Sequence, residues 1–485
     1  LVYRGASSAT GLLNMSVSHL FAGSFYFRKQ VLRKEGNALK CNSVKKAAVC
    51  IAAALSVMIA SFGAFAAEMK WTYDEAAKIV SVKGYGMIND AAELTKYLND
   101  AKIIDVQRGV TKIDRNVFSS LGNIEEVKLP EGLMSIGDNS FNLSSELKTV
   151  VFPKTLETIG AEAFMGCGSL TNVTIPENVS SIGVNAFANC VSVNEFNVSN
   201  DNECFAAVDG VIFTKDKKEL VMYPAGKEDE KYIIPDGTEK IREKAFAYNE
   251  NLKKAVIPES VNEIGNYAFY CCNDLKNVDF KTDKQSGPKS LGNYAFYGCR
   301  MKSVFIPFGT ETIGDGAFKN CDALTYADIP RTVKSIGTDA FYGVGDSIKI
   351  SGFGSFLRSF AEENNVPFLE SVRVMIGEKE IRFDCAATVR NGCTMVPMRK
   401  IFEELGAEVS WNAETQTASG AKNGDICTVT IGDNMIYKNG LGKELSAPAV
   451  IENGRTLVHA RAIAEAFGAD VLWNGEKGLV TIRIG

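Results

Sequence analysis

A repeat of 23 residues runs through the middle of the chain and constrains its fold more than any other feature. Residues 147–169 read LKTVVFPKTLETIGAEAFMGCGS, and residues 170–192 read LTNVTIPENVSSIGVNAFANCVS. One such unit is too small to bury its own apolar face, so successive units must stack on one another. We therefore expect a solenoid of ten units that spans residues 101–346.

Two of these units depart from the period. The unit at 193–228 is longer than the others, and the unit at 275–300 gains three residues. Because the period resumes after both, we interpret the extra residues as loops that bulge from a regular stack.

Each part of the repeat has a structural explanation. In the pattern L-x-x-V-x-I-P, the V and the I point inward on a short β-strand, and proline ends the strand because it lacks an N–H group. The apolar residues that follow are three to five apart, which favours a loose helical return on the convex side. One phenylalanine per unit should stack on the next as an internal spine. Its members are Phe118, Phe141, Phe164, Phe187, Phe246, Phe269, Phe296, Phe318 and Phe341.

The combined spacing of proline, Ile-Gly and Ala-Phe resembles the BspA-like leucine-rich repeats of secreted and surface proteins. The resemblance extends to both ends of the repeats, since 67–100 is similar to the N-terminal cap of that family and 347–370 to its closing segment. It implies an α/β leucine-rich-repeat solenoid with short parallel strands. Families of this type are associated with adhesion to host or matrix proteins and to other cells, so the resemblance also implies a binding surface.

A second internal duplication follows the repeats. NGCTMVPMRKIFEELGAEVSW (391–411) aligns with NGRTLVHARAIAEAFGADVLW (453–473). Each copy is typical of an Asn-Gly turn, a strand, a helix and a second strand that ends in tryptophan. Residues 371–485 are similar to the copper amine oxidase N-terminal-like, or stalk, domain of bacterial exported proteins, which implies a small duplicated α+β domain.

Composition argues against most catalytic chemistry. A copper oxidase site needs several imidazole ligands, whereas His459 is the single histidine after residue 66. The sequence contains neither a GxxxxGK[ST] phosphate loop nor a C-x-x-C zinc spacing. We therefore expect no enzyme activity, no catalytic residue, no metal and no cofactor. A hydrolase in the C-terminal region, built on paired carboxylates, is the alternative.

Five cysteines occupy one position of the repeat, three residues after the spine phenylalanine. They are Cys167, Cys190, Cys272, Cys299 and Cys321. Such a column favours a buried ladder in which cysteine serves as a small apolar side chain. Disulfides are the alternative, because an exported chain meets an oxidising environment.

The first 66 residues predict export. Three lysines precede the apolar run AAVCIAAALSVMIASFGAF, and an A-F-A site closes it. This pattern indicates a signal peptide at 40–66, cleaved after Ala66, and a transmembrane anchor is the alternative. We assign no role to the leader at 1–39. The first 66 residues hold 8 of the 53 Lys and Arg residues and one of the 58 Asp and Glu residues. The remainder is therefore acidic, which argues against a nucleic-acid partner.

The outward residue between the V and the I of each unit offers a candidate binding face. A solvated column should be polar, yet several of its members are apolar or aromatic. The candidate partner-binding face consists of Val151, Ile233, Val256 and Phe305, flanked by Tyr326. Strand propensity alone is one explanation for these residues, and a partly apolar partner site is the other.

These observations predict an exported, non-enzymatic binding protein, adhesin-like, that is secreted or held at the cell surface. Its expected partners are proteins or glycans of the host matrix, of host cells or of neighbouring bacteria, with the cell wall as a further candidate. The alternative function is a scaffold or accessory to cell-wall- or carbohydrate-active enzymes.

Overall fold

The computed structural model describes residues 69–97, 100–281, 287–345, 348–381, 383, 387–390, 392–452, 455–475 and 478–484. Residues Ala67–Gly485 form one compact unit. The predicted signal peptide at 40–66 and the leader before it lie outside the described residues. Within those residues, every helix is too short or too polar to cross a membrane.

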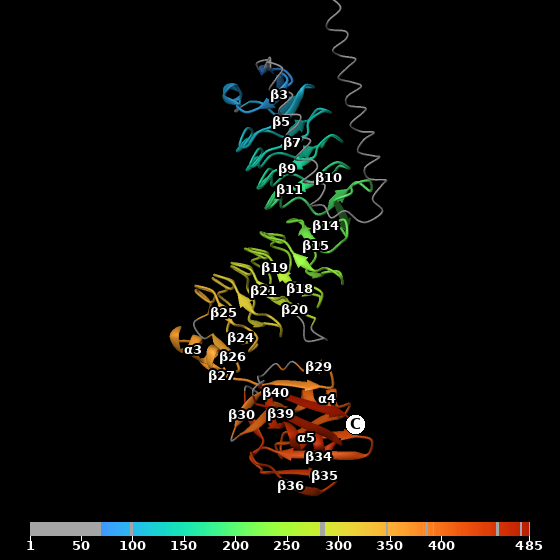
Figure 1. The fold of residues 1–485 in the computed structure, drawn as a ribbon, viewed down its shortest axis with the longest axis vertical. Coiled ribbons are helices and arrows are strands. Elements are labelled where there is room, and N and C mark those ends of the chain that lie inside the picture. The colour runs from blue at the N-terminus through green and yellow to red at the C-terminus, as the bar shows by residue number, and fades with distance from the viewer. Residues whose placement is uncertain are drawn as a thin grey trace, which may run out of the picture. The chain divides into compact units, whose positions relative to one another are not determined.

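The repeats form a β-solenoid to which successive coils contribute short strands (Figure 1). The V-x-I segment provides the first strand of a coil. The residues that end in the Ile-Gly pair of the repeat provide the second strand. Neighbouring coils pair in parallel, so that Ile104 lies opposite Val127 and Val127 opposite Val150. The V-x-I strands are β4 (Ile103–Val106), β6 (Glu126–Lys128), β8 (Thr149–Val150), β10 (Val173–Ile175), β12 (Phe196–Val198), β16 (Lys231–Ile233), β18 (Lys254–Ile257), β20 (Asn277–Phe280), β22 (Ser303–Phe305), β24 (Tyr326–Ile329) and β26 (Lys349–Gly352).

The second strands build two further parallel ladders, one before and one after the unit at 193–228. Ile136, for example, lies opposite Ile113 on one side and Ile159 on the other. These strands are β3 (Gly86–Ile88), β5 (Val110–Ile113), β7 (Ser135–Ile136), β9 (Thr158–Ile159), β11 (Ser181–Ile182), β17 (Lys240–Ile241), β19 (Glu263–Ile264), β21 (Ser290–Leu291), β23 (Thr312–Ile313) and β25 (Ser335–Ile336).

The return segment that carries the spine phenylalanine is not helical, so the expected helical return was wrong. The backbone has positive φ two residues before and two residues after each spine phenylalanine, as at Asn116 (61°) and Ser120 (59°) around Phe118. The N–H group of Phe118 donates to the carbonyl of Ser140 in the next coil at 2.8 Å. These backbone groups are satisfied between coils, which removes the need for the bonds of a helix.

The spine phenylalanines stack in two runs. Rings of adjacent coils lie 5.0–5.3 Å apart between centroids from Phe118 to Phe187, and 4.5–5.4 Å apart from Phe246 to Phe341. Every ring of the spine is at most 1% exposed apart from Phe341, which is half-buried. Stacked aromatic pairs add to the free energy gained from burial alone.

The unit at 193–228 separates these two runs and is not a bulging loop. Its strands β13 (Phe205–Val208), β14 (Val211–Thr214) and β15 (Glu219–Met222) form an antiparallel meander, and β15 pairs in parallel with β17. Residues on β14 and β15 enter two different cores. Ile212, Val221 and Met222 join the core of the preceding coils, whereas Val211, Phe213 and Leu220 join the core of the following coils.

We call β14 and β15 the partition hairpin. Both of its faces are apolar, so it is buried only if protein covers it on both sides. The extra residues at 193–228 therefore fold into the line of the solenoid. Part of the unit at 275–300, residues 282–286, lies outside the described residues.

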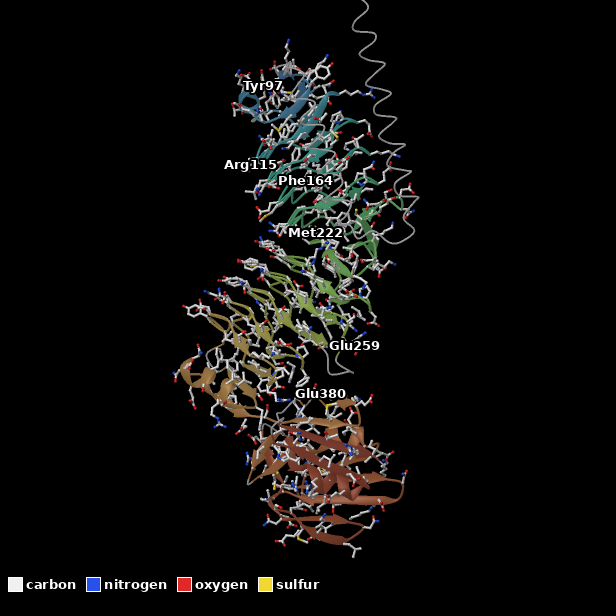
Figure 2. The ribbon with its side chains drawn as sticks, in the orientation of Figure 1. Tyr97, Arg115, Phe164, Met222, Glu259 and Glu380 are labelled. Atoms are coloured by element: carbon white, nitrogen blue, oxygen red, sulfur yellow. The ribbon has the colours of Figure 1, made fainter. Side chains whose placement is uncertain are left out.

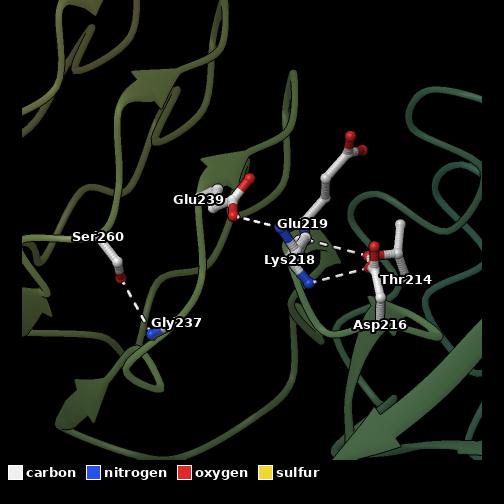
Figure 3. A network of polar contacts seen from close by, with 7 residues as sticks. All are labelled: Thr214, Asp216, Lys218, Glu219, Gly237, Glu239 and Ser260. Atoms are coloured by element: carbon white, nitrogen blue, oxygen red, sulfur yellow. Dashed lines mark hydrogen bonds and ion pairs between the residues drawn. The ribbon is translucent and has the colours of Figure 1, made fainter.

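Polar side chains form hydrogen bonds within the turn of the partition hairpin and link the hairpin to the next coil (Figure 3). The hydroxyl of Thr214 donates to Asp216 at 2.6 Å, and this hydrogen bond lowers the pKa of Asp216. The Nζ atom of Lys218 lies 2.5 Å from Oε1 of Glu239 in the following coil. Exposed ion pairs of this kind stabilise a fold only slightly.

Both ends of the solenoid carry capping elements. At the first end, β1 (Lys70–Asp74) pairs antiparallel with β2 (Ile79–Lys83), and the 3-10 helix η1 (Ala92–Lys96) follows. At the other end, α3 (Ser355–Glu363) leads into β27 (Phe368–Glu370), which pairs in parallel with β26.

The C-terminal domain repeats one strand–helix–strand motif. The first copy is β31 (Cys393–Pro397), α4 (Met398–Glu404) and β32 (Glu408–Asn412), and the second is β38 (Arg455–His459), α5 (Ala460–Ala466) and β39 (Ala469–Asn474). Val396 of β31 lies opposite Val458 of β38, and the rings of Phe402 and Phe467 meet edge to face at 5.2 Å. The other strands are β28 (Arg373–Ile376), β29 (Lys379–Glu380), β30 (Thr388–Arg390), β33 (Thr417–Lys422), β34 (Asp425–Thr430), β35 (Met435–Lys438), β36 (Leu441–Glu444), β37 (Val450–Glu452) and β40 (Leu479–Ile484).

Candidate functional site

Val151 and Ile233 are the exposed members of the predicted strand face. Val151 directly follows β8 and is 78% exposed, and Ile233 at the end of β16 is 49% exposed. Val256 lies opposite Ile233 on β18 but is only 8% exposed. Val256 therefore offers little surface to a partner, whereas the first two residues present apolar groups to solvent.

Phe305 and Tyr326 contact each other near the end of the solenoid. Their ring centroids are 5.8 Å apart, and both side chains are half-buried. They line a hollow of about 70 Å³ together with Phe308, Arg373 and other residues. The guanidinium of Arg373 lies 3.7 Å from the centroid of the Phe308 ring, within cation–π distance. This aromatic pair therefore faces a hollow that the C-terminal domain helps to form.

The residues of the predicted face lie on or next to three different sheets. Val151 adjoins the sheet β1-β2-β4-β6-β8, Ile233 belongs to the sheet β16-β18-β20, and Phe305 and Tyr326 belong to the sheet β22-β24-β26-β27. The structure brings the two aromatic residues together and leaves Val151 and Ile233 on other sheets.

The cysteine column is buried, and its thiols donate hydrogen bonds between coils. The Sγ atom of Cys190 lies 3.1 Å from the carbonyl oxygen of Phe164, and Cys272 makes the same contact with Phe246. Burial raises the pKa of Cys167 to about 12, so the thiol stays protonated at neutral pH. All five cysteines of the column are free thiols. They act as weak donors as well as small apolar side chains.

His459 lies at the junction of β38 and α5. It is half-buried, it lies opposite Met395 of β31, and burial followed by the charge of Arg461 lowers its pKa. Among the described residues, no three His, Cys, Asp or Glu side chains are close enough to hold a metal ion.

A cluster of tyrosines on the return segments was not anticipated from the sequence. Its members are Tyr248, Tyr267, Tyr270, Tyr294 and Tyr297, which we call the tyrosine cluster; all five are half-buried. Tyr267 stacks on Tyr294 at 5.2 Å, and Tyr270 stacks on Tyr297 at 4.7 Å. In Figure 2, aromatic rings project from the coils that carry β19 and β21. The signal in the sequence was the recurrence of Tyr at fixed offsets from Phe269 and Phe296.

The repeats match the model of the BspA type leucine-rich repeat region, in six copies over residues 96–208, 226–344 and 289–363. These stretches together cover just over half of the chain. The chain is a BspA-type leucine-rich-repeat protein. Residues 375–482 of this BspA-type protein match the copper amine oxidase N-terminal domain. No curated protein matches it.

Several solved bacterial structures are similar to this BspA-type protein. A leucine-rich cell surface protein of Faecalibacterium prausnitzii is 23% identical, with a TM-score of 0.45, and the match covers 62% of this chain and 98% of that one. A leucine-rich-repeat protein of Eubacterium ventriosum is 22% identical, with a TM-score of 0.44 and coverage of 58% and 94%. The pneumococcal vaccine antigen PcpA is 20% identical, with a TM-score of 0.48 and coverage of 62% and 96%.

Proposed function

We propose that this BspA-type protein is exported and recognises a partner through its repeats, as an adhesin-like protein without catalytic activity. The observation that carries the proposal is the exposure of apolar side chains on the coils, 78% for Val151 and 49% for Ile233. Exposed apolar groups on a rigid surface contribute to binding when a partner covers them. Stacked repeats also offer the extended surface that solenoids use for recognition.

The proposed partners are proteins or glycans of the host matrix, of host cells or of neighbouring bacteria. The strand-face residues Val151 and Ile233 are one part of the proposed binding surface, and the aromatic pair Phe305 and Tyr326 is another. The C-terminal domain then serves as a spacer or as the part nearest the cell wall.

The test compares the full chain with a variant of its strand face. Val151→Thr combined with Ile233→Thr introduces the residue that the repeat itself carries at Thr174, so the fold is expected to be kept. Binding to immobilised matrix proteins and isolated cell walls is measured by biolayer interferometry. We expect the affinity of the double variant to fall by about tenfold or more. Its Tm should change by no more than about 2 °C.

Asn197→Thr, at the same position of another coil, is the matched control and is expected to bind like the wild type. Phe305→Ser combined with Tyr326→Ser tests the aromatic pair in the same assay. Saturable binding that neither double variant changes would exclude these residues as the recognition surface.

A further inference from the structure

The tyrosine cluster occupies equivalent positions of successive coils. Tyr267 and Tyr294 each lie two residues before a spine phenylalanine, and Tyr270 and Tyr297 each lie one residue after it. Tyr267 and Tyr294 form one column, and Tyr270 and Tyr297 form a second. The two columns touch, because the ring centroids of Tyr267 and Tyr270 are 5.5 Å apart and those of Tyr294 and Tyr297 are 6.1 Å apart. The cluster is therefore a continuous block of rings on consecutive coils.

The backbone under this cluster is unfavourable for tyrosine. Tyr248, Tyr267 and Tyr294 have φ values of 65°, 57° and 54°, in the left-handed region. Every coil has this backbone conformation two residues before its spine phenylalanine, and other coils place Glu162, Asn185, Lys244 and Gly316 there. A bulky side chain is less favourable in this region than Asn or Gly.

A shallow hollow of about 390 Å³ adjoins the cluster. Its lining includes Asn266 and Asn293, which directly precede Tyr267 and Tyr294 in the chain. The Oδ1 atom of Asn266 accepts the N–H of Asn293, and that of Asn293 accepts the N–H of Asp315, both at 2.9 Å. The carboxamide oxygens are thus engaged, which leaves the NH2 groups to donate to a ligand.

The hydroxyl groups of the cluster are also suited to donate. Asn320 Nδ2 donates to the hydroxyl oxygen of Tyr297 at 2.7 Å, so the proton of that hydroxyl is directed elsewhere. Burial, with a smaller effect of Cys271, raises the pKa of Tyr270 to about 12, which keeps its phenol protonated. The surface therefore offers donors to acceptor groups of a partner.

The cations beside the cluster already have acidic partners. Lys244 lies over the ring of Tyr267 and 3.9 Å from Glu162, and Lys319 lies 2.9 Å from Asp339. The charge of this surface is therefore balanced locally, which fits a neutral partner better than a polyanion.

We propose that the tyrosine cluster and the adjoining hollow bind a neutral, proline-rich protein segment in the polyproline II conformation. Such a segment exposes unpaired backbone carbonyls and lacks an N–H group at each proline, so it needs donors. Aromatic surfaces with hydroxyl donors recognise such segments. This proposal goes beyond the proposed function, because it adds a second binding surface to the repeats and names the partner class of that surface.

The dimensions and the ring packing agree with an extended segment. One polyproline II turn is about 9.3 Å long, and two coils at strand spacing advance by about 9.5 Å. A glycan would need open ring faces for its sugars. Here Tyr267 and Tyr294 cover one another, and a Cβ atom at Gly316 would lie 2.4 Å from Cε1 of Tyr294. The ring faces are largely occupied, which disfavours any partner that must stack on them, so contact with the peptide would rely on the hydroxyl and amide donors.

The experiment measures binding of two probes to the full chain by fluorescence anisotropy. Labelled decaproline presents a single polyproline II chain, and a triple-helical peptide of Pro-Pro-Gly repeats presents the same chemistry in a collagen-like form. A Gly-Ser peptide of equal length is the control probe. We expect saturable binding of at least one proline probe and none of the Gly-Ser peptide; binding of only the triple helix would identify a collagen-like source.

Variants taken from the protein's own repeats keep the fold intact. Tyr267→Asn combined with Tyr294→Asn places Asn where Asn185 stands in another coil, and it is expected to weaken probe binding about tenfold or more. Its Tm should change little, because Asn suits the left-handed backbone and so offsets the lost ring stacking. Tyr267→Phe combined with Tyr294→Phe keeps the rings, removes two donors and should bind with intermediate affinity.

Three results would overturn this proposal. These are no saturable binding of either proline probe, equal binding by the Asn variant, and binding of a chitin or cell-wall oligosaccharide that the Asn variant loses. Matrix or cell-wall capture that persists when the proline probes fail leaves the proposed function standing. If the strand-face variant loses capture by matrix or cell-wall surfaces but still binds the proline probes, the strand face and the tyrosine cluster bind different partners.

Discussion

Phe187→Ala is a sharp test of how the partition hairpin divides the solenoid. Phe187 is 1% exposed and is the last stacked ring of the first run of the spine. It stacks on Phe164 at 5.3 Å and also contacts Phe152 at 6.2 Å and Phe196 at 5.6 Å. Removal of a fully buried phenylalanine side chain is expected to lower the free energy of unfolding by about 3–5 kcal/mol.

The loss of stability should be confined to the coils on one side of the partition hairpin. Phe187 belongs to the core that ends at Met222, whereas the next spine ring, Phe246, belongs to the core that begins at Val211. In a one-dimensional stack, stability is the sum of the units and their nearest-neighbour interfaces. Coils before 193 should therefore open at lower denaturant than coils after 230, and unfolding should separate into two steps.

Hydrogen exchange followed by mass spectrometry measures this directly, because each peptide reports its own opening free energy. Phe296→Ala is the matched control, since Phe296 is also 1% exposed but lies in the other core. Phe187→Ala should reduce protection before residue 193, and Phe296→Ala should reduce it after residue 230. Equal loss on both sides for either variant, or a loss below about 1 kcal/mol and so far under the range for a buried ring, would refute the reasoning.

Two further predictions concern the cysteine column and export. Cys190→Ser should be less destabilising than Cys190→Ala, because Ser144 already makes the equivalent hydrogen bond to Phe118. The lost donor in Cys190→Ala should cost about 0.5–1.5 kcal/mol, since the Phe164 carbonyl still accepts the N–H of Cys167. Urea titration measures both, and a more stable Ala variant would contradict the role of the thiol as a donor. If the signal peptide is cleaved after Ala66, N-terminal sequencing of the secreted protein should read from Ala67; an uncleaved chain in the membrane fraction would contradict export by this route.

The repeat period was sufficient to predict most of the fold. The spacing of Phe164 and its equivalents led to a stacked spine, because a residue that recurs once per coil must lie above its own copies. The strand–helix–strand motif of 391–411 and its duplicate followed from their apolar patterns. These inferences succeeded where a local pattern determines which way a side chain points.

The features that depend on contacts between coils were harder to predict. Val256 has the pattern of an outward residue, yet it is 8% exposed. The return segments looked helical, but their backbone bonds run to the next coil. The partition hairpin did leave a signal in the sequences VIFT and ELVM, which are apolar on both faces. That pattern is typical of a strand covered on both sides.

The tyrosine cluster was missed for a related reason. Single tyrosines at polar positions of a repeat are ordinary surface residues. Their significance arises only when coil stacking places Tyr267 against Tyr294 and Tyr270 against Tyr297. Neither the strained backbone nor the neighbouring hollow can be read from residue types alone.

The central proposal is that the repeats of this BspA-type protein recognise a partner. Its most direct test is the binding of the full chain to matrix and cell-wall surfaces, measured side by side for the wild type, the Val151→Thr and Ile233→Thr variant and the Tyr267→Asn and Tyr294→Asn variant. The account predicts saturable binding by the wild type and a loss of about tenfold or more in at least one variant whose Tm is unchanged. Saturable binding that all three proteins share equally would contradict it.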